Sequence, residues 1–161
     1  MFDESKKKIK ITDEKIALRK AENYCVYQER CQQEVRDKLY EWGLWSDAVE
    51  NIIVNLITNN FLNEERFAKV FAGGKFRIKK WGRVKIKLEL KKRKISDYCL
   101  KKAMREIEEE DYSRELKKII TETLKKYKST RPEVRKYKTA KYAISRGYES
   151  NLVWEEIKKN G

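Results

Sequence analysis

RVKIKLELKKRK, residues 83–94, can be read as a β-strand or as an α-helix, and the choice separates a β protein from an all-α one. Apolar residues stand at every second position from Val84 to Leu90, which is the alternation of a strand. The same stretch places Ile86 and Leu90 four residues apart, which is the spacing of one helix face. Periodicity within this stretch alone therefore leaves both structures open.

Internal repetition of the sequence favours the helix. Three stretches fall into register when displaced by about fifty residues: EVRDKLYEWGLWSDAVENII, KIKLELKKRKISDYCLKKAM and TAKYAISRGYESNLVWEEI. In each, apolar residues at helical spacing flank a short break, which predicts helix, turn, helix. Gly43 and Gly147 stand in two of the breaks, and glycine ends a helix by adopting positive φ. The matching apolar positions are Val35 and Leu39, Ile86 and Leu90, and Ala143 before the break, then Leu44, Ile95 and Tyr148 after it.

A third helix is predicted ahead of each pair. Asn63 is a suitable N-cap, and Glu64 and Glu65 suit the positive end of a helix dipole. The buried face of that helix is predicted to contain Phe67, Val70, Phe71 and Ile78.

The fold class predicted is all-α, with three tandem three-helix repeats forming an elongated, curved array in which each unit packs mainly on the next. We divide the chain into a basic tail and three repeats at 1–11, 12–61, 62–110 and 111–161. Residues 105–113 and 126–133 are predicted to be polar joints, with Pro132 in the first turn of the following helix.

The helix at 83–94 has apolar residues on two faces. Ile86 and Leu90 share one face, and Trp81, Val84, Leu88 and Ile95 gather nearly opposite. We expect the helix to be sandwiched between neighbours; the alternative is a face left for a partner. Three further tryptophans stand beside repeat positions and are predicted to pack in the core: Trp42, Trp45 and Trp154.

Composition limits the chemistry. The 161-residue chain has a formal net charge of +14, no histidine and three cysteines. The absence of histidine removes the commonest general base and zinc ligand. The cysteines lack the spacing of a metal site and are predicted to be reduced, partly buried thiols, which suggests the cytosol. No apolar run reaches a membrane-spanning length, so we expect neither secretion nor membrane insertion.

The positive charge is concentrated. Residues 75–102 contain thirteen Lys or Arg against two acids, whereas residues 44–65 contain four acids and no base. Self-repulsion of this size favours an anionic partner over a merely solvated face. For Trp81, base stacking or protein docking and a half-buried anchor remain equally open. The residues predicted to bind a filament or nucleic acid are Lys75, Arg77, Lys79, Lys80, Trp81, Arg83, Lys85, Lys87, Lys91, Lys92, Arg93 and Lys94.

No catalytic, cofactor or metal site is predicted. AGGKF at 72–76 lacks the first glycine and the closing Ser or Thr of a phosphate loop and falls within a predicted helix. The acids between Glu106 and Asp111 lie on a predicted polar joint without fixed geometry, so a solvated hinge is preferred to a metal site. We therefore expect a protein that is not an enzyme.

Residues 59–96, NNFLNEERFAKVFAGGKFRIKKWGRVKIKLELKKRKIS, resemble the middle repeat of the RecX family. The departures are Asn60 and Lys94 where the family usually has Gly, Asn63 for Asp, and Arg83 for Pro. The residues that carry the resemblance, which we assign to the structural motif, include Leu62, Glu65, Arg66, Phe67, Ala68, Phe71, Gly82, Ile86, Leu90 and Ile95, with Phe61, Glu89 and Lys91 also matching.

The resemblance implies a function. RecX proteins are bacterial regulators of the RecA recombinase, similar to an elongated clamp that lies in the groove of the RecA–DNA filament and restrains ATP hydrolysis and strand exchange. The resemblance implies a non-enzymatic regulator of homologous recombination, DNA repair and the SOS response. We expect it to be a cytoplasmic monomer. Its partner would be the RecA filament, with single- or double-stranded DNA also in contact.

Two rival hypotheses stay open. Helix-turn-helix units with basic flanks can bind DNA directly and without sequence preference. A carboxylate-based nuclease is the second rival, although no acidic cluster in the sequence supports it.

Overall fold

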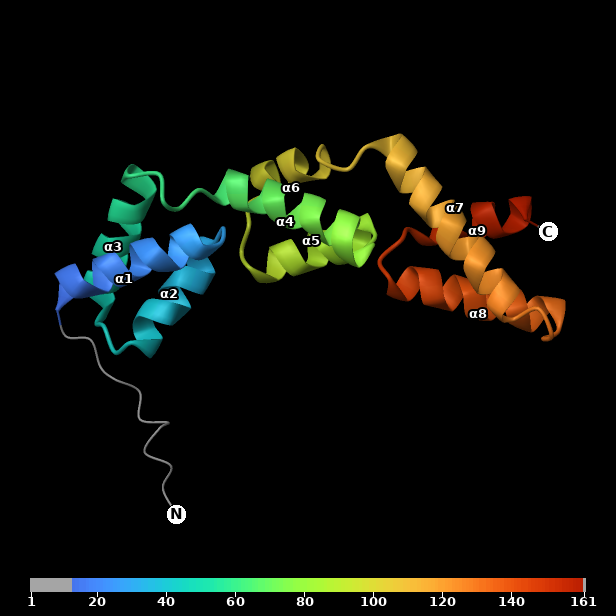
Figure 1. The fold of residues 1–161 in the computed structure, drawn as a ribbon, viewed down its shortest axis with the longest axis horizontal. Helices are drawn as coiled ribbons and strands as arrows, with labels where there is room; N and C mark the ends of the chain where they lie inside the picture. Colours follow the sequence, from blue (N-terminus) through green and yellow to red (C-terminus); the bar gives the residue numbers. More distant parts are fainter. Residues whose placement is uncertain (1–12, 161) are drawn as a thin grey trace, which may run out of the picture.

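The computed structural model describes residues 13–160, which form nine α-helices and no strand. The helices follow one another in an elongated, curved arrangement (Figure 1). The all-α prediction is confirmed, and residues 83–92 are helical. The predicted tail at 1–11 lies outside the described residues. The helices are α1 (Glu14–Tyr27), α2 (Gln32–Glu41), α3 (Ser46–Thr58), α4 (Glu64–Lys79), α5 (Arg83–Lys92), α6 (Asp97–Met104), α7 (Glu109–Lys126), α8 (Pro132–Ser145) and α9 (Ser150–Lys159).

The helices pack in groups of three. We call α1–α3 the N-terminal unit, α4–α6 the middle unit and α7–α9 the C-terminal unit. The main helix–helix contacts all lie within a unit, so the expectation that each unit packs mainly on the next is wrong. In every unit the second helix, α2, α5 or α8, lies on the concave side of the array (Figure 1).

Local signals in the sequence set several helix ends as predicted. The Asn63 side chain accepts a hydrogen bond from the Arg66 N–H at 2.9 Å and caps α4. Pro132 is the first residue of α8. Gly43 and Gly147 have φ of 92° and 101° in the breaks of their repeats. Lys94 stands at the same place in the middle unit and adopts φ 58°, a conformation that glycine adopts more easily.

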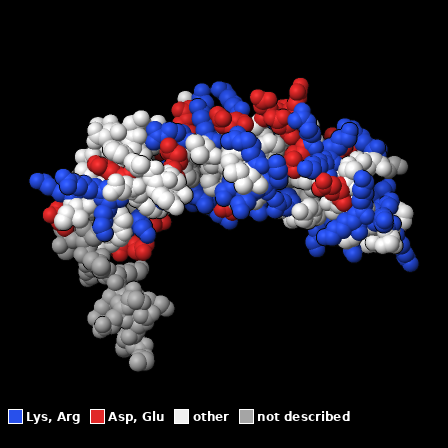
Figure 2. Space-filling view, viewed as in Figure 1, with Lys and Arg blue, Asp and Glu red and all other residues white. Residues whose placement is uncertain are grey.

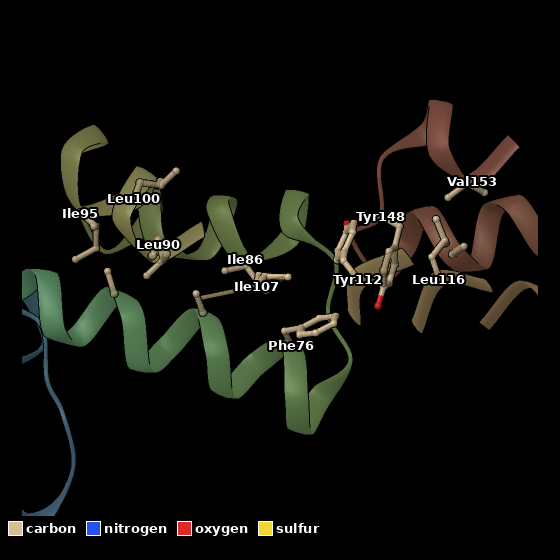
Figure 3. Packing of buried hydrophobic residues seen from close by; sticks show 14 of the residues in the cluster. Phe76, Ile86, Leu90, Ile95, Leu100, Ile107, Tyr112, Leu116, Tyr148 and Val153 are labelled. Carbon is tan, nitrogen blue, oxygen red and sulfur yellow. The ribbon is translucent and has the colours of Figure 1, made fainter. Parts of the chain in front are cut away.

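The buried residues form two clusters. The N-terminal unit has its own cluster, whereas the middle and C-terminal units share one, to which Cys31 at the start of α2 also belongs. Tyr112 joins the two halves of the shared cluster, because its ring lies 5.8 Å from Phe76 and stacks at 5.1 Å on Tyr148 (Figure 3). Five matched repeat positions are fully buried at 0% exposure: Val35, Leu39, Ile86, Leu90 and Ala143.

The start of α5 is held by the C-terminal unit. The Gly82 N–H donates to the Arg146 carbonyl at 2.8 Å, and the Val84 N–H donates to the Gly147 carbonyl at 2.9 Å. Between them, the Arg83 N–H donates to the Tyr112 hydroxyl at 3.1 Å. N–H groups at a helix start have no partner within the helix, so these bonds satisfy donors that would otherwise need water.

Two predicted apolar faces are correct only in part, since Phe67 and Ile95 are buried but other members of each face are exposed. Val84 and Leu88 of α5 are 51% and 53% exposed, so this helix is not sandwiched. In α4, Val70 and Ile78 are 53% and 79% exposed. The buried side of α4 is centred on Ala68, Ala72 and Gly73, whose small side chains allow close contact with α6. It consists of Phe67, Ala68, Ala72, Gly73 and Phe76.

Other expectations for packing also need correction. Trp42 packs against the N-terminal cluster as predicted, but Trp45 and Trp154 are 52% and 43% exposed. The predicted joint at 105–113 is in part the beginning of α7, and Tyr112 within it is buried. An acidic run there is compatible with a helix because acids stabilise the first turn. Across residues 13–160, no helix is sufficiently long and apolar to cross a membrane.

Candidate binding surface

The basic residues of the middle unit gather around α5. Figure 2 shows Lys and Arg on the concave side of the middle unit, where Figure 1 places α5, and again around α8. Acidic residues gather on the opposite edge, near the start of α7. The charge is therefore distributed unevenly between the two sides of the curve.

Four of the predicted binding residues have carboxylate partners. Arg83 and Arg93 each contact two carboxylates, whereas Lys92 and Lys80 contact one. The pairs are Arg83 with Glu109 (2.6 Å) and Glu149 (2.7 Å), Arg93 with Glu89 (3.1 Å) and Glu34 (3.5 Å), Lys92 with Glu89 (3.2 Å), and Lys80 with Glu115 (3.9 Å). The positive charge of these four side chains is therefore partly neutralised by carboxylates of the protein itself.

The other predicted basic residues make no ion pair within residues 13–160. We call them the free basic set: Lys75, Arg77, Lys79, Lys85, Lys87, Lys91 and Lys94. Lys87 and Lys91 are exposed and lie four residues apart in α5, on the same side of the helix. Cations that no neighbouring carboxylate neutralises are available to an anionic partner.

Trp81 sits at the centre of this charge. It is half-buried, and its ring meets Phe71 edge-on with the centroids 6.4 Å apart. The ammonium groups of Lys75 and Lys85 lie 4.9 and 4.5 Å from the Trp81 ring centroid. Cation–π contacts of this kind hold the lysines close to the ring. The anchor role is thus visible in the geometry, while base stacking stays a prediction.

Arg83 belongs to the junction between units. Its guanidinium lies 3.9 Å from the Tyr112 ring centroid, and its side chain is 17% exposed. The Tyr112 hydroxyl donates to the Glu149 carboxylate, and burial raises the pKa of Tyr112 well above its ordinary value. A proline at position 83 has no N–H and could not donate the hydrogen bond that the Tyr112 hydroxyl accepts from Arg83. Arg83 in place of the usual proline therefore adds a contact between the middle and C-terminal units.

Arg66 has a structural role at the first junction of the array, between the N-terminal and middle units. Its Nε lies 2.5 Å from a Glu29 carboxylate oxygen, and its Nη2 donates to the Asn60 carbonyl at 3.1 Å. Its sequence neighbour Glu65 lies 3.9 Å from Lys69. Arg66 therefore ties the N-terminal unit to the first turn of α4.

A groove that the sequence did not reveal runs beside α4. It has a volume of ≈ 500 Å³ and lies between α4 and the residues that join α1 to α2. We call it the α4 groove. Its lining includes the exposed Val70 and Ile78, which the sequence analysis assigned to the core. The α4 groove is lined by Gln28, Glu29, Glu34, Phe67, Val70, Phe71, Gly74, Lys75, Ile78, Lys79 and Arg93.

The two stretches rejected as a phosphate loop and as a metal site, residues 72–76 and 106–111, are a helix and an exposed acidic run. Residues 72–76 continue α4 without a loop. Among residues 13–160, no three His, Cys, Asp or Glu side chains are grouped so as to hold a metal ion. The acids between Glu106 and Asp111 are exposed, and one of them, Glu109, pairs with Arg83.

Two family models match the chain. The model described as RecX, first three-helix domain, matches residues 17–56, and that described as RecX, second three-helix domain, matches residues 63–104. This chain belongs to the RecX family. The resemblance seen in residues 59–96 is thereby confirmed.

Individual RecX proteins match over most of the chain. "Regulatory protein RecX" of Prosthecochloris aestuarii is 27% identical over 148 residues, which cover 91% of this chain and 94% of that protein. "Regulatory protein RecX" of Clostridium perfringens is 32% identical over 124 residues, or 74% of this chain and 56% of that protein. The crystal structure of RecX from Lactobacillus salivarius superposes with a TM-score of 0.81 at 21% identity, covering 91% of this chain and 95% of that one. This likeness supports the three-helix repeat fold.

Proposed function

We propose that this RecX protein regulates homologous recombination and DNA repair by binding in the groove of the RecA–DNA filament and restraining its ATP hydrolysis and strand exchange. The role is non-enzymatic and belongs to the bacterial cytoplasm and the SOS response. Membership of the RecX family supports the regulatory role. The observation that carries the mechanism is the pair of exposed, unpaired lysines Lys87 and Lys91 on α5, the helix on the concave side of the curved array. A polyanionic partner of complementary shape would face this side.

The free basic set supplies attraction, whereas shape supplies selectivity. Charge alone speeds encounter with any polyanion and discriminates poorly between them. The arrangement of the three units adds a curved surface that naked DNA and a nucleoprotein filament would fit differently. Half-buried Trp81 contacts Phe71 and two lysines of the basic set, Lys75 and Lys85.

The first test is ATP hydrolysis by the RecA of the same bacterium on single-stranded DNA, titrated with this protein at two salt concentrations. Binding to naked DNA is measured in parallel. We expect inhibition at protein concentrations that leave naked DNA unbound. If inhibition develops only as the DNA becomes coated, the direct DNA-binding hypothesis replaces the filament hypothesis.

A charge-reversal variant tests the surface. Lys87→Glu with Lys91→Glu reverses two exposed residues of the free basic set, and we expect inhibition to weaken at least tenfold. The matched control is Lys117→Glu with Lys118→Glu on α7, which changes net charge equally at exposed lysines that also lack an ion pair. If both variants weaken inhibition alike, net charge and not the concave surface is responsible.

Salt dependence gives a second readout. Each phosphate contact contributes about 0.7–0.9 to the slope of log affinity against log salt. If Lys87 and Lys91 each contact a phosphate of the filament, their reversal lowers the slope for filament binding by about 1.4–1.8. An unchanged slope with weaker binding would place these lysines against protein carboxylates instead.

A further inference from the structure

Gly74 occupies a position that the fold of this chain does not require to be glycine. It lies inside α4 with helical backbone, and a Cβ added there would meet nothing within 4 Å. Glycine in a helix interior is unfavourable relative to alanine because it loses more conformational freedom on folding. A residue that weakens its own helix without an internal packing reason leaves space for something outside the chain.

The space above Gly74 is bordered by exposed aliphatic side chains. Val70 and Ile78 lie one turn before and one turn after Gly74, and all three line the α4 groove. Val70 is 53% exposed and Ile78 is 79% exposed. Two apolar ridges with a gap between them form the surface into which a second helix can pack closely.

The charge of the α4 groove selects its occupant. Glu29 and Glu34 on one side are matched by Arg66 at 2.5 Å and Arg93 at 3.5 Å. On the other side, Lys75 and Lys79 have no ion pair within residues 13–160. The net charge presented to an occupant is therefore positive and lies along one edge of α4.

These features fit a protein segment better than a nucleic acid. Single-stranded nucleic acid binds through exposed aromatic platforms and a basic track. The aromatic residues that line the groove are buried (Phe67) or half-buried (Phe71), and the exposed side chains around Gly74 are aliphatic. An amphipathic helix places an apolar face into such a groove and sets its charged edge against charges on the rim.

We propose that the α4 groove is a docking site for an amphipathic helix of a protein partner, which lies over Gly74 and sets acidic residues opposite Lys75 and Lys79. This surface is distinct from Lys87 and Lys91 of α5. The proposal does not depend on the identity of the filament partner. It assigns a contact to the first junction of the array, between the N-terminal and middle units.

The probe is a fluorescein-labelled helical peptide of about 15 residues, a length at which an isolated helix can form. It carries leucines at helical spacing and glutamates along one edge, and binding is followed by fluorescence anisotropy. We expect saturable binding to the full-length protein. The same peptide with lysines in place of the glutamates is expected to bind at least tenfold more weakly.

Gly74→Leu separates docking from folding. The leucine fills the space above α4, so we expect peptide affinity to fall at least tenfold. A helix-favouring residue replaces glycine in open space, so we expect the Tm to stay level or rise by about 2–4 °C. A residue needed only for the fold would not show lower binding together with undiminished stability.

Ile78→Asp tests the apolar rim against a matched control. We expect it to abolish peptide binding, whereas Val54→Asp, at a 61% exposed valine of α3, leaves binding unchanged. Equal losses in the two variants would overturn the proposal. So would failure of the wild-type protein to bind the acidic peptide, or equal binding of the lysine peptide.

Two further measurements identify a wrong occupant. Sedimentation that reveals self-association abolished by Gly74→Leu would assign the groove to a second copy of this chain. Weaker binding of Gly74→Leu to naked single-stranded DNA would assign it to nucleic acid. Either result would overturn the proposal. None of these assays contains RecA, so their failure is distinguishable from failure of the proposed regulatory function.

Discussion

Gly82 and Gly147, far apart in the sequence, lie backbone against backbone at the junction of the middle and C-terminal units. A Cβ added to Gly82 would stand 2.2 Å from the Gly147 carbonyl carbon, and one added to Gly147 would stand 2.4 Å from the Lys85 Cβ. The contact brings the Gly147 carbonyl to the Val84 N–H at 2.9 Å. The family motif has a glycine at Gly82, and this close approach is the physical reason that a larger residue would not fit.

Gly82→Ala is expected to destabilise the protein by about 3 kcal/mol. The added methyl group would meet backbone atoms of Gly147 and Tyr148, which cannot move aside as a flexible side chain could. Equilibrium denaturation measures the free energy of unfolding. Gly74→Ala is the matched control, since its Cβ meets open space and alanine should stabilise α4 by about 1 kcal/mol. Equal changes in the two variants would mean that the junction yields to the added methyl group.

Lys94→Gly is expected to stabilise the protein by about 1 kcal/mol, because a left-handed conformation is costly for a residue with a Cβ. Lys94 has φ 58° at the end of α5, where the other two repeats carry glycine. Thermal unfolding at neutral pH provides the measurement. Lys92→Gly, inside the last turn of the same helix, should instead destabilise by about 1 kcal/mol. If Lys94→Gly does not raise the stability, the left-handed backbone at position 94 is not strained.

Arg66 and Glu29 should be energetically coupled across the first junction. A double-mutant cycle with Arg66→Ala and Glu29→Ala is expected to give a coupling free energy of about 1 kcal/mol, since the pair is partly exposed but short and fixed by further bonds to Asn60. The control cycle uses Lys69 and Glu65, which are 3.9 Å apart on the surface and should show almost no coupling. Comparable values in the two cycles would argue against a tie between the units.

The three thiols should react at two rates. Cys25 and Cys31 are buried, and burial raises the pKa of Cys25 to about 11 and that of Cys31 to about 12. Their reactive thiolate forms are therefore scarce at pH 8, and access is blocked as well. Cys99 is half-buried and should be labelled first by a thiol reagent. The native protein should show one fast thiol, and the unfolded protein three. Three fast thiols in the native state would mean that the two clusters that bury Cys25 and Cys31 both open readily.

The helices of this protein were largely predictable because their signals are local. The repeat spacing of Ile86 and Leu90 outweighed the strand-like alternation of the same stretch, and both residues are buried in α5. Asn63 and Pro132 mark helix starts through hydrogen bonding and fixed φ, which depend only on neighbouring residues. The RecX resemblance followed from one such run of residues.

The surfaces were less predictable, because exposure depends on which elements meet. Val70 and Ile78 share helical spacing with core residues, and only the position of α6 shows that the buried side of α4 lies elsewhere. Arg83 counted as one more positive charge in the sequence, whereas Glu109 and Glu149 from the C-terminal unit surround it. Ion pairs between distant residues leave no mark in local composition.

The sequence by itself determined the class of elements, their threefold repetition and the concentration of positive charge, since each depends on residues close together in the chain. Only the tertiary structure decided which lysines remain unpaired, why Gly82 must be small while Gly74 need not be, and where the α4 groove lies. The physical reason is that packing and electrostatic neutralisation are set by distances between units, and such distances are fixed only when the whole chain has folded.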